Sequence, residues 1–299
     1  VLFSINIKKR FLLFILFSPL AVSDSYQYNL YNNHGVVGLI NTPTARLFDG
    51  AVHGITVYDG TPPQKVTLSS NPFDWLEASY QYTDVNNFLY SESPEFSGKQ
   101  SYKDKSFDAK FRLIKERSLI PQVAVGFRDF GGSALFAAEY IVASKLIGNV
   151  DFTLGLGFGT ISNKNIANPL AKLDSRFESR DRNTLSDTLG WEINFGKFFG
   201  GKEAGLFGGV EIFLPKLNGT RLKIEYDSTN YLEDGEGYLP VEQDGKFNYS
   251  FVYPVTKNFH VKIGYIRNNT LSFGFSIAGN YGQRRSTVIA KSDPPSVID

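Results

Sequence analysis

The stretch NVDFTLGLGFGT, residues 149–160, poses the question of the fold. Large apolar side chains alternate in it with small or polar ones. A period of two places the two sets on opposite faces of a β-strand. The apolar set is Phe152, Leu154, Leu156 and Phe158, and the opposite set is Asp151, Thr153, Gly155 and Gly157. The stretch therefore predicts a strand with one apolar face and one small or polar face.

The same alternation returns along most of the chain. It is clear in SFDAKFRLIKE (106–116), TRLKIEYD (220–227), GKFNYSFVYP (245–254), NFHVKIGYIRN (258–268) and TLSFGFSIAG (270–279). Many of these runs have about ten residues, longer than the usual five or six of a soluble sheet. The predicted strands are 51–58, 63–69, 73–83, 105–115, 121–129, 133–145, 149–159, 188–198, 205–215, 219–228, 246–255, 258–268 and 270–279.

Composition limits the class of protein. The 299 residues hold 31 Lys+Arg and 30 Asp+Glu, a net charge of +1, so no global field attracts nucleic acid and none is expected as a partner. Aromatic residues make up 15% of the chain, which suits strands. The absence of cysteine excludes disulfides, thiolate metal sites and a catalytic cysteine.

The N-terminus predicts export. Lys8, Lys9 and Arg10 precede an apolar run over 11–20, and Ala21-Val22-Ser23 provides small residues for cleavage. This order is typical of a secretory signal peptide, here residues 1–23. The alternative is an N-terminal membrane anchor, but the run is shorter than the ~20 residues that a spanning helix needs.

Two architectures present one apolar and one polar face: a soluble β-sandwich and an outer-membrane β-barrel. Strand length favours the barrel, since about 9–11 tilted residues cross a bilayer. Aromatic residues near strand ends, such as Tyr226 and Tyr253, would form its interfacial girdle. We therefore predict an all-β, antiparallel transmembrane barrel of about 12 strands in the cell outer membrane of a Gram-negative-type bacterium, in contact with outer-membrane lipid.

The predicted boundaries are a segment over 24–50 before the barrel, the barrel over 51–280, and a linker-like tail over 281–299. Long connections near 84–104, 160–187 and 229–245 should all lie on one side. With thirteen predicted strands they do not, so one strand predicted between 188 and 228 is superfluous.

The lipid-facing set in the opening stretch would be Phe152, Leu154, Leu156 and Phe158. An arginine at Leu154 would then cost roughly 2–4 kcal/mol. An arginine at Thr153 would meet a polar lumen and should cost much less.

Polar residues on the opposite face are candidates for the lumen wall. The candidates are Asp108, Lys110, Arg112, Arg128, Asp129, Glu139, Glu192, Arg221, Lys223 and Glu225. Arg128 and Asp129 would be a charge pair that touches a polymer or another subunit, or an internal ion pair that closes the mouth of the barrel. The carboxylates Glu139, Glu192, Glu211 and Glu225 could form an acid–base pair for glycan cleavage, but polar wall residues balanced by Lys and Arg are the favoured interpretation. Trp75 and Trp191 are candidates for stacking on sugar rings, with a girdle or packing role as the alternative.

Nothing in the sequence indicates covalent chemistry. Of the histidines His34, His53 and His260, the last shares a face with Lys262 and Gly264, which favours a lumen or rim position over a catalytic one. No His/Asp/Glu cluster has the spacing of metal ligands. The glycine-rich runs are not followed by a helix, so they are not phosphate loops. We expect no enzymatic activity, no cofactor and no metal.

Several long blocks resemble the YjbH-type exopolysaccharide biosynthesis proteins. The blocks are GLINTPTARLFDG (38–50), FDWLEASYQYTDV (73–85), YKDKSFDAKFRLIKE (102–116), IPQVAVGFRDFGGSALFAAEYIVASK (120–145) and DFTLGLGFGT (151–160). IRNNTLSFGFSI (266–277) is similar to the closing strands of that family's first barrel. Family members are outer-membrane barrels encoded with exopolysaccharide or group 4 capsule secretion genes, and most are longer than this chain.

The resemblance implies a non-catalytic part in export or assembly of exopolysaccharide or capsule. A polar lumen or rim would guide glycan, or the barrel would be a scaffold for other secretion proteins. Polysaccharide and those proteins are the implied partners. The alternatives are a general porin or channel and an outer-membrane hydrolase of lipid or glycan.

Overall fold

The computed structural model describes residues 29–91, 93–132, 136–162, 166–180, 198–229, 231 and 241–281. The predicted signal peptide, nearly all of the predicted tail, and residues 188–197 of one predicted strand lie outside these ranges. No helix among the described residues has the length and hydropathy to cross a membrane.

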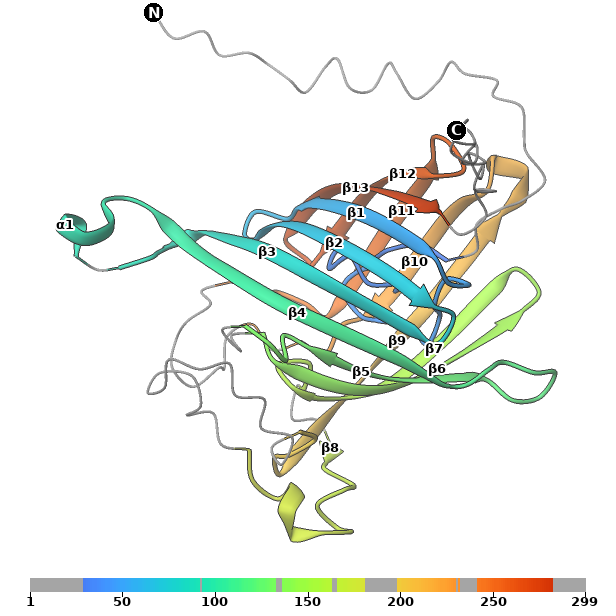
Figure 1. The fold of residues 1–299 in the computed structure, drawn as a ribbon, viewed down its shortest axis with the longest axis horizontal. Coiled ribbons are helices and arrows are strands. Elements are labelled where there is room, and N and C mark those ends of the chain that lie inside the picture. Colours follow the sequence, from blue (N-terminus) through green and yellow to red (C-terminus); the bar gives the residue numbers. More distant parts are fainter. Residues whose placement is uncertain are drawn as a thin grey trace, which may run out of the picture.

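Strands account for nearly all the regular structure (Figure 1). They are β1 Val52–Asp59, β2 Gln64–Phe73, β3 Leu76–Leu89, β4 Ser101–Ile114, β5 Gln122–Arg128, β6 Ala138–Ile147, β7 Val150–Gly159, β8 Ile166–Ala167, β9 Glu203–Leu214, β10 Thr220–Tyr226, β11 Phe247–Pro254, β12 Phe259–Ile266 and β13 Thr270–Asn280. The helix α1, Pro94–Ser97, lies at the tip of the β3–β4 hairpin, and short 3-10 turns span Ser175–Phe177 and Pro215–Leu217.

The strands close into an antiparallel ring. Each strand pairs with its neighbour in sequence, β7 pairs with β9, and β13 pairs with β1 from Val52↔Asn280 to Asp59↔Phe273. The two-residue β8 adds only to the start of β9. The ring thus has 12 strands, which confirms the predicted barrel.

The two rims of the barrel differ in the length of their connections. The ring closes without the strand predicted over 188–198, and the long connections after β3, β7 and β10 all leave from one rim. Tight turns occupy the other rim, where β1 begins and β13 ends. In outer-membrane barrels long loops are extracellular and short turns periplasmic, so we term these the outer and the inner rim.

The opening stretch forms β7 with the predicted faces over most of its length. Leu154 is 64% exposed on the outer face, whereas Thr153 is buried inside. Gly155 also faces inward, and the ring of Phe207 on β9 lies where a Cβ would be, 2.1 Å away. Phe158 differs from the prediction: it is on the outer face but fully buried, because Phe199 packs over it at 5.3 Å between ring centroids.

The segment before β1 does not precede the barrel but fills it. Residues 29–50, here termed the plug, lie inside the ring, and every residue over 30–45 is buried (Figure 1). Backbone bridges Tyr31↔Val37 and Gly38↔Pro43 fold the plug on itself. At Gly38 a Cβ would lie 2.5 Å from the carbonyl oxygen of Thr42, so this fold needs glycine there.

The filled lumen overturns one expectation about β7. The hydroxyl of Thr153 is 2.8 Å from that of Ser144, which accepts a hydrogen bond from the backbone N–H of Ala45 in the plug. An arginine at Thr153 would therefore meet packed protein and not open water. It should disturb the plug as well as the wall.

The plugged lumen as the candidate functional site

The plug has little regular structure, so its backbone groups need partners from elsewhere. A buried N–H or C=O without a partner costs free energy comparable to a lost hydrogen bond. The inward faces of the strands supply these partners through long charged side chains. Charged side chains of the wall thereby form hydrogen bonds with polar backbone groups of the plug.

Glu225 on β10 is the strongest anchor. Its carboxylate accepts the backbone N–H groups of Ile40 at 2.8 Å, Asn41 at 2.9 Å and Thr42 at 2.8 Å. It also accepts the Thr42 hydroxyl at 2.8 Å and the side-chain amide of Asn248 at 2.8 Å. Hydrogen bonds to an ionised acceptor are about twice as strong as neutral ones, so this fully buried carboxylate holds the turn of the plug firmly.

A buried ion pair holds both polar groups of Val37. Glu77 on β3 accepts the Val37 N–H at 3.1 Å, and Lys110 on β4 donates to the Val37 carbonyl at 2.8 Å. The two side chains are 3.0 Å apart in a salt bridge. Each charge thus has its counter-ion and one plug group.

Two further lysines donate to plug carbonyls from the other side of the ring. Lys223 on β10 donates to the Gly38 carbonyl at 2.7 Å and pairs with Glu211 at 3.1 Å. Lys262 on β12 donates to the Asn32 carbonyl at 2.8 Å and to that of Tyr31 at 3.2 Å. Side chains from β3, β4, β10 and β12 therefore all bind the plug.

Arg46 fastens the plug where it meets the inner rim. Its guanidinium donates to Asp151 at the start of β7 at 2.7 and 2.8 Å, and to Glu116 in the β4–β5 turn at 2.5 Å. Burial would raise the pKa of Glu116, but ion pairs with Lys145 and Arg46 and the Leu146 N–H hold that pKa below its usual value. This cluster ties the plug to the inner rim.

The outer end of the plug is covered by connections between strands. Phe136 from the β5–β6 connection and Val241 from the β10–β11 connection pack with Val85 of β3 into a buried cluster. Beneath it is a cavity of about 30 Å³ that His34 and Arg128 help to line, room for a water molecule. The Nδ1 atom of His34 lies 2.8 Å from the Nζ atom of Lys65.

Most of the predicted wall residues lie inside the ring. The buried inward-facing ones are Asp108, Lys110, Arg128, Asp129, Arg221, Lys223 and Glu225. Arg128 donates to the plug carbonyl of Asn41 at 3.0 Å, while Asp108 accepts the Asp129 N–H. Arg112 is at the rim beside Asp74, and Glu192 lies outside the described residues.

Glu139 is on the other face from the one predicted. In the register of β5, β6 and β7 it stands between Phe127 and Phe158, both on the outer face. It is nevertheless buried, because Arg180 of the β7–β9 connection pairs with it at 2.5 Å and the Phe199 N–H donates to it at 2.8 Å. This connection therefore lies against the outer wall, tied by a covered ion pair.

The candidate aromatic residues are only partly described. Trp75 is 46% exposed on the outer face beside the inner rim, and stacks on Phe73 at 5.3 Å between ring centroids. That position suits an interfacial girdle and not a glycan site in the lumen. Trp191 lies outside the described residues. Within the described ranges, no group of three or more His, Asp or Glu residues could hold a metal.

Glu77 and Lys262, which both bind the plug, were not among the predicted wall candidates, although Lys262 was assigned to the polar face of its strand. Glu77 and Lys262 stand in the inward sets of their strands, in the alternating runs EASYQYTD (77–84) and HVKIGY (260–265). The period-two signal that selected Lys110 and Glu225 was present for both. The sequence did not indicate that the plug would lie inside the barrel, where Glu77 and Lys262 bind it.

A closed antiparallel ring with lipid-compatible outer residues, filled by its own N-terminal segment, defines a plugged outer-membrane β-barrel. The YjbH family, described as "Exopolysaccharide biosynthesis protein YbjH", matches residues 30–299, and the chain belongs to this family. It is 41% identical over 287 residues to "Uncharacterized lipoprotein YjbH" of Escherichia coli (strain K12). The match covers 93% of this chain and 40% of that relative's length.

Solved barrels resemble the chain only loosely. A KdgM porin gives a TM-score of 0.39 at 9% identity, covering 76% of this chain and 98% of its own. A NanC porin gives 0.34 at 10% identity, covering 76% and 97%, and outer membrane phospholipase A from Escherichia coli gives 0.30 at 10% identity, covering 77% and 92%. The assignment as a barrel rests on the strand pairing itself.

Proposed function

We propose that this chain is a closed, non-catalytic outer-membrane scaffold for exopolysaccharide export or assembly. The family supports the link to exopolysaccharide. The plug supports the scaffold: wall charges that could have met a glycan in the lumen bind the protein's own backbone instead. Glycan and secretion proteins would then act at the rims of the barrel and not through its centre.

The energetics favour a plug that stays in place. A hydrogen bond to a charged group contributes about 1.5–3 kcal/mol net. Glu225, Lys223 and Lys262 each make at least two to the plug, so release would break many such bonds together. A barrel held closed in this way is poorly suited to free diffusion.

The proposal extends to location and to the absence of catalysis. Export by a cleaved signal peptide would deliver the chain to the outer membrane, where it should fractionate with that membrane and migrate differently when unheated. The buried carboxylates Glu77 and Glu225 are engaged with plug N–H groups, which leaves them unsuited to acid–base catalysis. Protein recovered soluble from the periplasm without detergent would contradict the location.

The decisive experiment combines gene loss with conductance. Deleting the gene should reduce cell-associated or released polysaccharide, and the wild-type gene should restore it. Purified full-length protein in a planar bilayer should show little conductance, and deleting residues 29–48 should raise it. Strong salt-dependent conductance of the wild type, with polysaccharide unchanged in the deletion strain, would instead establish a porin. Turnover of lipid or glycan by the purified protein would establish a hydrolase.

A further inference from the structure

The outer face near the outer rim changes from apolar to charged within three rows of side chains. These rows run across β2, β3 and β4 in register and face outward. From the middle of the barrel toward the outer rim they are Leu68–Tyr80–Phe107, Val66–Tyr82–Lys105 and Gln64–Asp84–Lys103. An apolar row below and a charged row above mark the boundary between hydrocarbon and headgroups. The middle row, with Tyr82 and Lys105, therefore stands at the level of the outer-leaflet headgroups.

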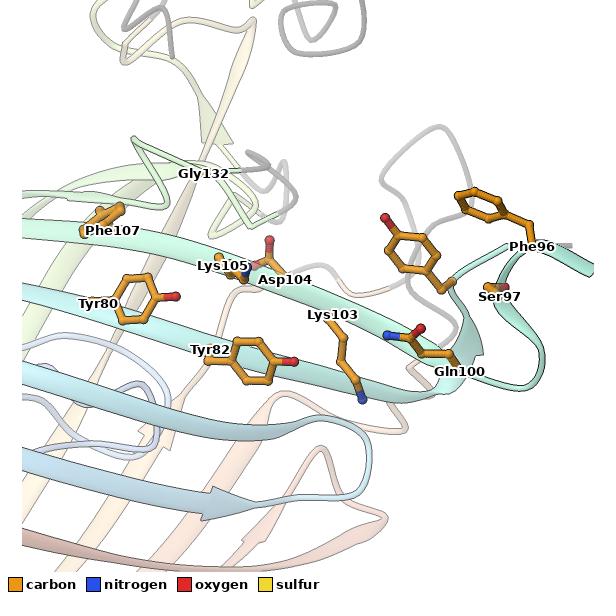
Figure 2. A pocket seen from close by; sticks show the side chains of 11 residues that line it. Tyr80, Tyr82, Phe96, Ser97, Gln100, Lys103, Asp104, Lys105, Phe107 and Gly132 are labelled. Atoms are coloured by element: carbon orange, nitrogen blue, oxygen red, sulfur yellow. The ribbon is translucent and has the colours of Figure 1, made fainter. Parts of the chain in front are cut away.

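A groove opens at this level. The β3–β4 hairpin extends beyond the start of β2 at the outer rim: the first residue of β2, Gln64, pairs with Asp84, whereas β3 continues to Leu89 (Figure 1). The groove has a volume of about 800 Å³. Its lining includes Tyr80, Tyr82, Tyr90, Phe96, Lys103 and Lys105 (Figure 2). A volume of this order suits an organic group far larger than inorganic phosphate.

The two lysines of the groove differ in their surroundings. Lys103 forms an ion pair with Asp84 and donates to the Ser101 hydroxyl at 2.7 Å, so its charge is compensated. Lys105 is exposed and makes no ion pair or side-chain hydrogen bond within the described part of the chain. Asp104 also contributes to the lining of the groove, but it belongs to the inward set of β4 and is buried. As far as the described residues go, the groove therefore presents one cation without a counter-ion beside tyrosine rings.

We propose that this groove binds the phosphorylated sugar headgroup of an outer-leaflet glycolipid. The Lys105 ammonium pairs with the phosphate, and the Tyr80 and Tyr82 rings contact an apolar face of the sugar. The acyl chains lie along the apolar row of Leu68 and Phe107 below. This binding is independent of any part in polysaccharide export, since it uses only the outer wall.

The competing explanation is a lysine that merely extends into mixed headgroups without selecting one. A binding titration distinguishes the two explanations. Full-length protein in detergent is titrated with a diphosphorylated lipid A, its dephosphorylated form, phosphatidylglycerol and inorganic phosphate, and native mass spectrometry measures the bound fraction. Lys105→Gln should weaken binding of the diphosphorylated lipid roughly tenfold or more, and Lys105→Arg should retain most of it. Lys257→Gln, in an exposed turn at the inner rim, removes the same charge and should change nothing.

Several outcomes would overturn the proposal. Equal binding by Lys105→Gln and Lys257→Gln would exclude Lys105 as the phosphate ligand. Equal affinity for phosphatidylglycerol and lipid A would show an unselective cation, and saturation by inorganic phosphate alone would show that no lipid is required. Tyr82→Leu gives a second test, since it should weaken binding of lipid A without affecting the weaker binding of phosphatidylglycerol. Heat-modifiable migration checks that each variant is folded.

Discussion

Replacing Glu225 by glutamine tests the docking of the plug most directly, because the change removes a charge and almost no volume. Oε2 of Glu225 accepts from Ile40, from Asn41 and from both donors of Thr42. Oε1 accepts from Asn248, whose own carbonyl oxygen is committed to the Arg267 N–H at 2.7 Å. A glutamine can therefore place its oxygen toward the plug, but its NH₂ group then faces the Asn248 amide donor.

The expected loss follows from these contacts. The bonds kept to the plug become neutral, which halves their strength of about 1.5–3 kcal/mol each. The contact with Asn248 becomes donor against donor. Lower desolvation of the neutral side chain offsets part of the loss. We expect a net weakening of plug docking of about 3 kcal/mol, or roughly 150-fold in the docked-to-undocked ratio.

The absence of natural cysteine makes the measurement simple. Val36→Cys places a thiol on the plug at a position only 4% exposed, so a maleimide reaches it only when the plug leaves its site. The labelling rate should rise roughly 150-fold in Glu225→Gln, with rare conductance steps in bilayers. Glu242→Gln, in an exposed part of the β10–β11 connection, is the matched control. Equal labelling rates in the two variants would refute the assignment of Glu225 as the anchor.

Three further predictions concern the wall, the inner rim and the β7–β9 connection. Leu154→Arg should lower the stability of the barrel in lipid vesicles by roughly 2–4 kcal/mol, measured by urea titration. Leu119→Arg, in an exposed turn, is the control and should leave the stability unchanged. Equal effects of the two substitutions would contradict the assignment of Leu154 to the lipid-facing surface. Because the pKa of Glu116 is below its usual value, the stability it contributes is complete above about pH 4.3 and is lost as the pH falls through its lowered pKa. The stability gap between wild type and Glu116→Gln should therefore close in acid, and a gap independent of pH would argue against the ion pair. Arg180→Gln leaves Glu139 buried with only a backbone donor, so proteolysis between β7 and β9 should accelerate while the barrel stays folded; an unchanged rate would show that the ion pair is dispensable.

The barrel could be predicted from the sequence because its signal is local. Period-two alternation fixes the faces of β7 and β10 without knowledge of their neighbours, and even-numbered closure identified a surplus strand. The assignment of side chains to faces was wrong at Glu139 of β6. In the run FAAEYIVASK (136–145), small or apolar residues occur in both alternating sets. There the alternation carries no contrast, so the charge alone suggested the wrong face.

The plug could not be predicted because its signal is not local. The stretch GLINTPTARLFDG (38–50) resembles a loop before a barrel. Its backbone N–H groups find their acceptor in Glu225, which is 183–185 residues away in sequence. The wall residues were recognised as polar, but a charge balanced within the wall and a charge that binds a backbone N–H look alike in sequence. The burial of Phe158 was missed for the same reason, since Phe199 reaches it across a long connection.

The position of the plug immediately before β1 constrains how the barrel is assembled. The plug leads directly into β1, and β1 completes the ring only when β13 pairs with it. The partners of the plug on β10 and β12 are therefore synthesised after most of the other strands of the ring. A closed ring has no side opening through which a folded segment could enter, so we expect the strands to wrap around the plug as they pair. The plug is then a template for closure, and a variant that weakens it should slow assembly at the membrane even where the finished barrel is stable.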